Sequence, residues 1–273
     1  MRPSVLGAYN VAHCGACLAS RFSMTTGTYL RTLLMTAAMC GASTASHAQT
    51  PAAAPEYRFS ADFAMGWDKG LSGNINSSGI GKINNQTAVI LKNKYEDVYG
   101  TGLHIRFGGG YMLDAKTEVR AAITIQSLDA DLVQLGEIGA SNLYGQYDDY
   151  QSVGLDFGYR RYSDIKPALK AYTEASVGLA FVDETDVVLV APQANLSGTA
   201  TDFYDRTAAF SLGGNVGLLW QAAARYGVFG QFGVRYVTGM SEIDGLAGTG
   251  LETINDKSGR WTIPFLFGIR ARF

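Results

Sequence analysis

Three residues of the types found in hydrolytic triads lie in the first half of the chain. Ser60 and Asp62 are two positions apart on one predicted strand, and His104 is the only histidine after residue 48. If the first two predicted strands pair with each other, His104 falls close to Asp62. A nucleophile and its base must lie within hydrogen-bond reach at a rim that a substrate can enter. These positions are in mid-strand, so the pattern favours a packed polar pair, and we predict no enzymatic activity.

Metal and cofactor chemistry finds little support in the sequence. Cys14 and Cys17 have CxxC spacing, but a single such motif without a second ligand pair is weak evidence for a site. Acidic residues gather in four polar stretches, 68–99, 127–149, 183–206 and 239–257, and none has EF-hand spacing. A hydrated acidic surface explains them, so we expect no metal and no cofactor.

A further set of charged residues alternates with apolar ones and so shares one face of successive strands. Buried charges are tolerated chiefly when they are paired. We therefore predict a network of ion pairs inside the fold, with Asp156 and Glu174 near each other and sharing the neighbouring arginines. The predicted network consists of Asp62, His104, Arg106, Arg120, Asp156, Glu174 and Arg235.

The elements that position these residues are strands. From Tyr57 onward, apolar residues recur at every second position, which places them on one face of a strand and not on one stripe of a helix. The same alternation recurs along the chain. The predicted strands are 57–67, 103–111, 119–126, 153–160, 169–181, 210–220, 228–236 and 261–273.

The connections between these strands alternate in length. The four long polar stretches take turns with short ones near 114–116, 162–167 and 221–225. Long outer loops and short periplasmic turns are typical of transmembrane barrels, whereas a sandwich has no reason to sort its loops by side. We predict an all-β fold, an antiparallel up-and-down transmembrane β-barrel of about eight strands, over residues 57–273. Such a barrel is narrow enough for its own side chains to fill.

The first 48 residues have the features of an export signal. Arg31 precedes an apolar segment, and Ser46-His47-Ala48 resembles a cleavage site, so we predict a signal peptide over 1–48 and a short periplasmic lead-in over 49–56. Translation starting at Met24 is an alternative. Three of the 22 basic residues and none of the 24 acidic ones lie before residue 50, so the remainder has 19 basic residues and a net charge of −5. This balance argues against nucleic acid as a partner.

The last strand carries the residues of a resemblance. The stretch ends on an aromatic residue with apolar residues at alternate positions before it, namely Phe265, Phe267, Ile269, Ala271 and Phe273. In this the chain resembles the small outer-membrane β-barrels of the OmpA, OmpX and opacity-protein type. The resemblance implies a Gram-negative cell outer membrane, contact with its lipids and lipopolysaccharide, and a terminal signal read by the barrel-assembly machinery. Pro264 interrupts this strand, and we expect a bulge there.

For function, these observations favour a non-enzymatic surface protein that supports envelope integrity or presents extracellular loops for adhesion or recognition. The loop ligand is not specified by the sequence. One alternative is a narrow channel resembling the OmpW group, which would require an apolar lumen. A lipid-modifying barrel enzyme is the other, and it lacks a convincing constellation of residues at the rim.

Overall fold

The computed structural model describes residues 57–194, 196–242, 246–255 and 259–273, and these are mainly strands. The predicted signal peptide over 1–48, the start at Met24 and the lead-in over 49–56 lie outside the described residues. In the part of the chain that is described, no helix is both long and apolar enough to cross a membrane.

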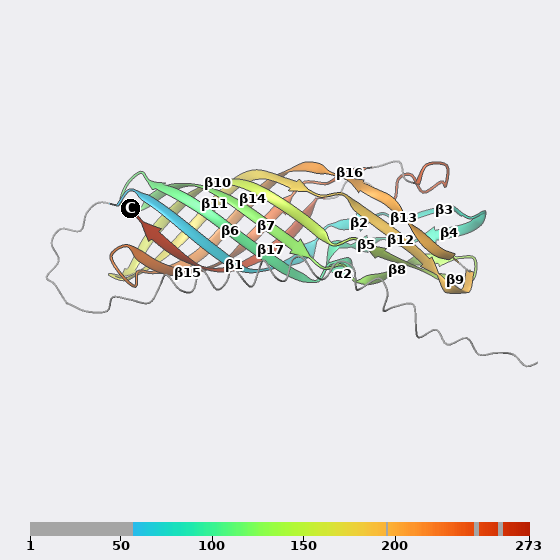
Figure 1. Cartoon of the computed structure of the whole chain (residues 1–273), viewed down its shortest axis with the longest axis horizontal. Coiled ribbons are helices and arrows are strands. Elements are labelled where there is room, and N and C mark those ends of the chain that lie inside the picture. The colour runs from blue at the N-terminus through green and yellow to red at the C-terminus, as the bar shows by residue number, and fades with distance from the viewer. Residues whose placement is uncertain (1–56, 195, 243–245, 256–258) are drawn as a thin grey trace, which may run out of the picture. The chain divides into compact units, whose positions relative to one another are not determined.

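Eight strands close into an antiparallel barrel, which confirms the predicted fold (Figure 1). The first and last strands pair over their whole length, from Ser60 opposite Arg272 to Ser72 opposite Trp261. In their order around the barrel the strands are β1 (Phe59–Ser72), β17 (Arg260–Arg272), β15 (Tyr226–Val237), β14 (Thr207–Trp220), β11 (Leu169–Val182), β10 (Tyr150–Lys166), β7 (Thr117–Leu128) and β6 (Thr101–Met112).

The barrel wall is apolar outside and polar inside, because alternate residues of a strand point to opposite faces. Outward aromatic rings contact one another across neighbouring strands, with Phe63 5.0 Å from Phe107 and Trp67 6.0 Å from Phe265 between ring centroids. Many of the outward apolar side chains are exposed. This is the reverse of a fold that buries its apolar face.

The connections sort by side as predicted. Three short turns, 113–116, 167–168 and 221–225, lie at one end, which we call the turn end. The four long connections lie at the other, the loop end. The predicted turn over 162–167 is wrong in its bounds, because β10 continues to Lys166 and places Tyr162 inside the barrel.

The long connections were predicted to be polar loops, and the structure corrects this. They fold together into a second antiparallel sheet of seven strands, the loop sheet. Figure 1 shows these strands beyond the loop end of the barrel, with the C-terminus at the turn end. In sheet order they are β16 (Ser241–Glu242), β13 (Leu196–Asp205), β12 (Thr185–Ala191), β9 (Ser141–Tyr147), β8 (Leu132–Ile138), β4 (Gln86–Ile90) and β3 (Gly79–Ile83).

Smaller elements complete the loop end. Strands β2 (Asn74–Asn76) and β5 (Asn93–Lys94) pair with each other, and α2 (Tyr95–Val98) is a single helical turn. A 3-10 turn, η1 (Pro192–Ala194), links β12 to β13. The β3–β4 hairpin turns at Asn84 and Asn85, whose φ angles of 51° and 62° are those of the turn that matches strand twist and that asparagine tolerates well.

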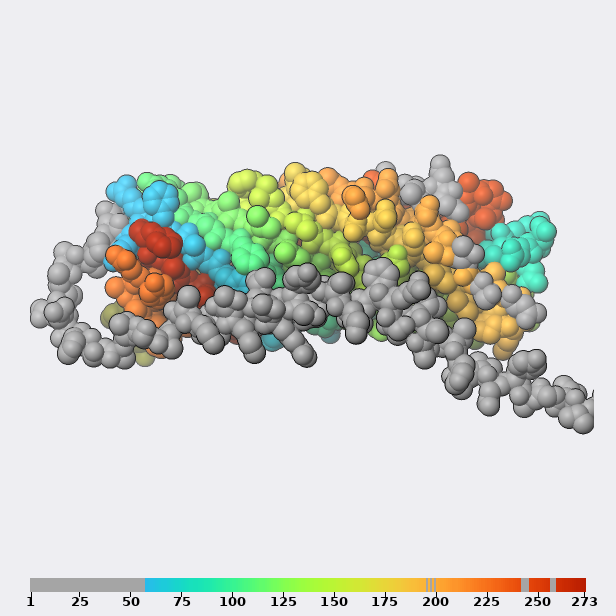
Figure 2. All heavy atoms as spheres, in the orientation of Figure 1, coloured from blue at the N-terminus to red at the C-terminus, as the bar shows by residue number. Residues whose placement is uncertain are grey.

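Segment 246–255 covers the outer edge of β3. The amide of Lys82 donates to the carbonyl of Thr249, and that of Ser77 donates to the carbonyl of Ile254, both at 2.6 Å. Figure 2 shows this segment as red-orange spheres beside the cyan spheres of β3 and β4. An edge strand that would otherwise be open to another chain is therefore paired within this one.

The loop sheet has its own apolar core. Its buried side chains include Leu143, Tyr147, Val187, Phe203 and Leu251, and they pack continuously onto apolar residues at the tops of the barrel strands. The hydroxyl of Tyr204 donates to the carbonyl of Ile75 at 2.5 Å, which joins β13 to the first long connection. These connections are packed structure and not hydrated loops.

Pro264 does not create the expected bulge. It pairs with Asp68 in an unbroken register, and the shift between β1 and β17 lies at Gly70 and Ser72 instead. On the other side of the strand, the pairing with β15 is interrupted between Phe265 and Thr262, and the register stays the same. Trp261 is exposed on the outer face, as the alternation along this strand requires.

Candidate functional site

The lumen is filled by two joined ion-pair clusters, and Glu174 on β11 is the centre of one. Its carboxylate accepts a hydrogen bond from Arg106 Nη2 at 2.5 Å and from Arg160 Nε at 2.7 Å. Arg120 Nε is 3.6 Å from the same carboxylate. All four side chains are buried. One carboxylate therefore partly neutralises three arginines.

Glu118 on β7 is the centre of the second cluster. It accepts hydrogen bonds from Ser60 Oγ at 2.6 Å, from the hydroxyl of Tyr162 at 2.7 Å, and from Arg270. Arg120 links the two clusters, because its Nε lies 3.6 Å from Glu174 and its Nη1 lies 3.8 Å from Glu118. Its Nη2 also lies 2.5 Å from Asp62. Charge-assisted contacts of this kind hold side chains from several strands in one geometry.

Aromatic side chains pack against the clusters at the turn end. The guanidinium carbon of Arg160 is 4.0 Å from the ring centroid of Tyr172, whose hydroxyl donates to Gln231 at 2.9 Å. Gly217 makes room for that ring, since a Cβ there would lie 2.4 Å from Tyr172 Cζ. The arrangement leaves the lumen closed by stacked side chains at this level.

Asp156 has a separate set of partners. It accepts from Ser211 at 3.1 Å and from Thr124 at 3.4 Å, and Arg235 Nη2 is 3.5 Å away. The expected sharing of arginines between Asp156 and Glu174 is wrong within the described residues: Arg106 and Arg120 contact Glu174, and Arg235 contacts Asp156.

His104 pairs with a carboxylate other than the one expected. Its Nδ1 is 3.3 Å from Asp68 Oδ2, which also accepts from Gln126 at 2.6 Å. In the β1–β6 register His104 is opposite Gly66, whereas Asp62 is opposite Gly108. The predicted neighbourhood of His104 and Asp62 is therefore wrong.

The Ser/His/Asp constellation is accordingly not assembled. Ser60 hydrogen-bonds Glu118, Asp62 pairs with Arg120, and His104 contacts Asp68. All three side chains are buried in the lumen. Hydrolysis through this set would require a nucleophile and a base in contact, which the register prevents.

Aromatic residues seal the loop end above His104. Arg260 is 3.9 Å from the ring centroid of Tyr150 and 5.6 Å from that of Tyr95. Tyr95 stacks on Tyr99 with centroids 5.9 Å apart, and burial raises the pKa of the Tyr99 hydroxyl well above its ordinary value. These rings are neutral and continuous with the loop-sheet core.

The outer face of the loop sheet carries acidic residues at one place. Asp186 and Asp202 are opposite each other on β12 and β13, and the amide of Asp186 donates to Asp148 at 3.3 Å. Partial burial, followed by the charges of Asp148 and Asp202, raises the pKa of Asp186. Within the described ranges, no group of three or more His, Cys, Asp or Glu side chains is arranged to hold a metal ion.

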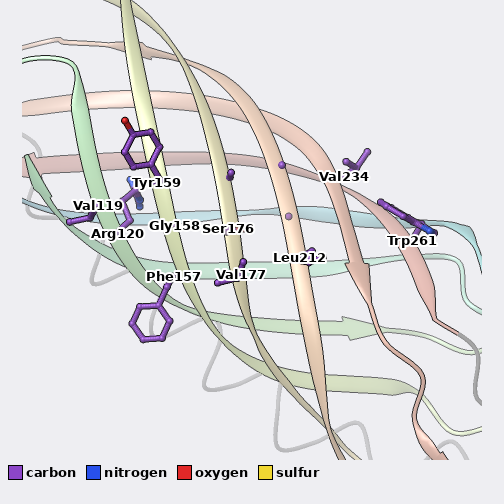
Figure 3. A pocket seen from close by; sticks show the side chains of 13 residues that line it. Val119, Arg120, Phe157, Gly158, Tyr159, Ser176, Val177, Leu212, Val234 and Trp261 are labelled. Carbon is purple, nitrogen blue, oxygen red and sulfur yellow. The ribbon is translucent and has the colours of Figure 1, made fainter. Parts of the chain in front are cut away.

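A shallow apolar groove of about 630 Å³ lies on the outer wall of the barrel. Figure 3 shows Phe157 and Tyr159 on one side of it and Val234 and Trp261 on the other. Ala175 and Gly214, which have small side chains or none, form part of its lining. Arg120, which belongs to the ion-pair clusters, is also among the residues that line it.

The residues of the proposed assembly signal lie on the outside of β17. Phe265, Phe267, Ile269 and Phe273 are exposed, and Ala271 is half-buried opposite Ala61. Phe265, Phe267, Ile269 and Ala271 are part of β17, the strand that closes the barrel, and Phe273 directly follows it. Their recognition by assembly machinery stays a prediction.

Sequence reasoning missed four residues of the lumen, Asp68, Glu118, Tyr162 and Arg260. Each lies just beyond the end of a predicted strand: Asp68 and Tyr162 fall in a predicted polar stretch and a predicted turn, and Glu118 and Arg260 fall between a predicted connection and the next strand. The two-residue alternation of inward-facing residues, extended past the predicted strand ends from Arg120 to Glu118 and from Asp62 to Asp68, would have identified such residues.

No family model and no curated protein matches this chain. Among solved structures, it is similar to Neisserial surface protein A, at 13% identity over 79% of this chain and 97% of that one, with a TM-score of 0.38. The outer membrane protein OprG from Pseudomonas aeruginosa gives 12% identity, 80% and 97% coverage and a TM-score of 0.42. The outer membrane protease OmpT from Escherichia coli has 10% sequence identity to this chain, and the match covers 82% of this chain and 99% of that one with a TM-score of 0.38.

These similarities are too low to carry an argument about activity, and membership of the OmpA, OmpX and opacity-protein type is not confirmed. The assignment of the fold rests on the strand pairing of this chain. That pairing makes a closed antiparallel barrel of eight strands whose lumen is charged and filled.

Proposed function

We propose that this chain is a non-enzymatic outer-membrane barrel that anchors its loop sheet at the cell surface for adhesion or recognition. The observation that carries the proposal is the folding of all four long connections into one sheet with a common core. Such a sheet presents a fixed surface, whereas separate loops would each pay the entropy of ordering when a partner binds.

Placement in a membrane is supported by the inverted wall of the barrel. Its outward side chains are apolar and exposed, and its backbone groups are paired around a closed ring without an edge strand. A closed barrel is one of the two structures that satisfy backbone hydrogen bonds in hydrocarbon. The outer-membrane lipids, including lipopolysaccharide, would then cover the wall.

The filled lumen argues against the channel alternative. An OmpW-like path for apolar molecules requires an apolar lumen, whereas Arg106, Arg160 and Glu174 occupy this one and are ion-paired across it. An eight-stranded barrel has little room beside such side chains. We therefore assign the lumen an anchoring role that keeps the wall rigid under the loop sheet.

Cysteine labelling on intact cells tests the orientation. Ile80→Cys in the loop sheet and Lys116→Cys in a turn are both at exposed positions, and the native cysteines all precede residue 48. A membrane-impermeant maleimide should label the first variant and spare the second until the cells are lysed, with the parent as the blank. Equal labelling of the two on intact cells would contradict the proposal.

Planar-bilayer recording tests the closed lumen. The purified parent should give no unitary conductance steps, and a variant that removes lumenal charges, such as Glu174→Ala with Arg160→Ala, serves as the comparison. Reproducible steps in the parent would favour the channel alternative.

A further inference from the structure

A small cavity lies in mid-lumen between the Glu174 cluster and the His104–Asp68 pair. Its volume is about 30 Å³, which is enough for one or two species the size of a water molecule. Side chains from strands all around the barrel line it. The polar ones that matter here are His104, Arg106, Asp156, Asn215, Gln231 and Arg235.

Arg106 Nε is a buried donor with no hydrogen-bond partner among the described residues. His104 Nε2 is also unpartnered, but it is an acceptor when Nδ1–H donates to Asp68. Asp156 is the carboxylate of the lining, and its oxygens already accept from Ser211, Thr124 and Arg235. A group that accepts a hydrogen bond would satisfy the remaining donor.

The charge balance points the same way. Six buried arginines, Arg106, Arg120, Arg160, Arg235, Arg260 and Arg270, share the barrel interior with five buried carboxylates, Asp62, Asp68, Glu118, Asp156 and Glu174. In the lining of the cavity, two arginines, Arg106 and Arg235, stand against the one carboxylate of Asp156, and Arg106 shares Glu174 with Arg160. An uncompensated charge is costly in a buried site.

We propose that this cavity binds one small monovalent anion of the halide class, held between Arg106 and Arg235. The size of the cavity excludes larger organic anions. The anion would complete the charge balance of the lumen and stiffen the barrel. This inference does not depend on the surface role proposed above.

Diffraction from crystals grown in sodium bromide tests the site directly. We expect an anomalous peak inside the lumen, within hydrogen-bond distance of Arg106 and Arg235. Peaks confined to the protein surface, or no lumenal peak, would overturn the proposal.

Unfolding kinetics supply a second test in detergent solution. The parent should unfold about tenfold more slowly in sodium chloride than in sodium gluconate of equal ionic strength. Ser176→Leu places a side chain in the cavity and should abolish this difference. Ser152→Leu is the matched control, because Ser152 also faces the lumen but does not line the cavity, and it should keep the difference.

The two measurements are read together. Equal unfolding rates of the parent in the two salts, or a difference that Ser152→Leu removes as well, would contradict an anion in this cavity. If Ser176→Leu fails to fold, the bromide peak in the parent still decides the question.

Discussion

The barrel and the loop sheet use the same two-residue alternation with opposite polarity. On β11 of the barrel, Tyr172 and Glu174 point inward while Val177 and Leu179 are exposed outside. On β9 of the loop sheet, Leu143 and Tyr147 point inward, whereas Asn142 is exposed outside. The barrel wall is thus suited to an apolar surrounding and the loop sheet to water, although the strands of both are formed by one kind of pattern.

The reversal of polarity occurs at the loop end of the barrel. The lumen holds charges up to Asp68 and Arg260, and then the rings of Tyr95, Tyr99 and Tyr150 begin the apolar interior. Arg260 lies at this boundary, with its guanidinium against the Tyr150 ring. A cation over an aromatic face joins the two interiors without leaving a bare charge in the apolar one.

The largest expected effect is on formation of the barrel itself. Deleting Phe273 should abolish most insertion into the outer membrane, far more than the roughly 1.5 to 3 kcal/mol that even complete burial of a Phe side chain contributes. The reason is that the strand closing the barrel would lose the aromatic end of its proposed signal. Membrane fractionation measures the outcome, with Phe273→Tyr as a control that keeps the aromatic group. Normal insertion of the deletion variant would count against the signal.

Removing a charge from the lumen should lower the free energy of unfolding of the barrel. Glu174→Gln leaves Arg106 and Arg160 without their carboxylate, and losing one partner of a buried pair costs about 3 to 5 kcal/mol. Urea unfolding in lipid bilayers measures the change. Asp164→Asn at the turn end is the control, because that carboxylate is half exposed and should matter by less than about 1 kcal/mol.

A double-mutant cycle sharpens this prediction. Glu174→Gln should couple more strongly to Arg160→Met, where nitrogen and oxygen are 2.6 Å apart, than to Arg120→Met at 3.6 Å. It should not couple to Arg235→Met, whose partner is Asp156. Coupling of equal size in all three cycles would mean that the lumen responds as one diffuse charge and not as the pairs described.

A change in the apolar core of the loop sheet should affect that sheet alone. Leu143→Ala opens a cavity in the apolar core of the loop sheet, for which the typical cost is about 2 to 5 kcal/mol. The loss should be local, so that proteolysis of the loop sheet accelerates while the urea midpoint of the barrel stays unchanged. Asn142→Ala, on the outer face of the same strand, should change neither. A lower barrel midpoint in Leu143→Ala would show that the two interiors unfold together.

The sequence predicts features of the two interiors that depend on local alternation, and it does not predict those that depend on strand register. The eight barrel strands were predictable, since alternation is a local property of residues such as those from Tyr57 to Trp67. Partners were not, because pairing depends on register: a strand that continues past Trp67 brings Asp68, and not Asp62, to His104. The loop sheet was not predicted because its strands are short and acidic residues lie within or beside them. In β12, for example, Asp186 is part of the strand, and Asp183 and Glu184 precede it.

The smallest predicted effect concerns the outer face of the loop sheet and its dependence on pH. Partial burial and the neighbouring Asp148 and Asp202 raise the pKa of Asp186 above its ordinary 3.8, so the folded sheet holds this proton more tightly than the unfolded chain does. Protonation therefore favours the folded state, and this contribution is present below pH 3.8 and is lost as the pH rises through the raised pKa.

Asp186→Asn should remove that dependence and stabilise the loop sheet at pH 7 by less than about 1 kcal/mol, since the repulsion is between partly exposed charges. Hydrogen exchange of the β12 and β13 amides, corrected for intrinsic rates at each pH, measures the change. Asp183→Asn is the matched control with the opposite sign, because Asp183 lies 2.7 Å from Arg206 and its loss removes an attraction. If both variants shift protection in the same direction, general acidity of the surface and not the Asp186 cluster governs this face.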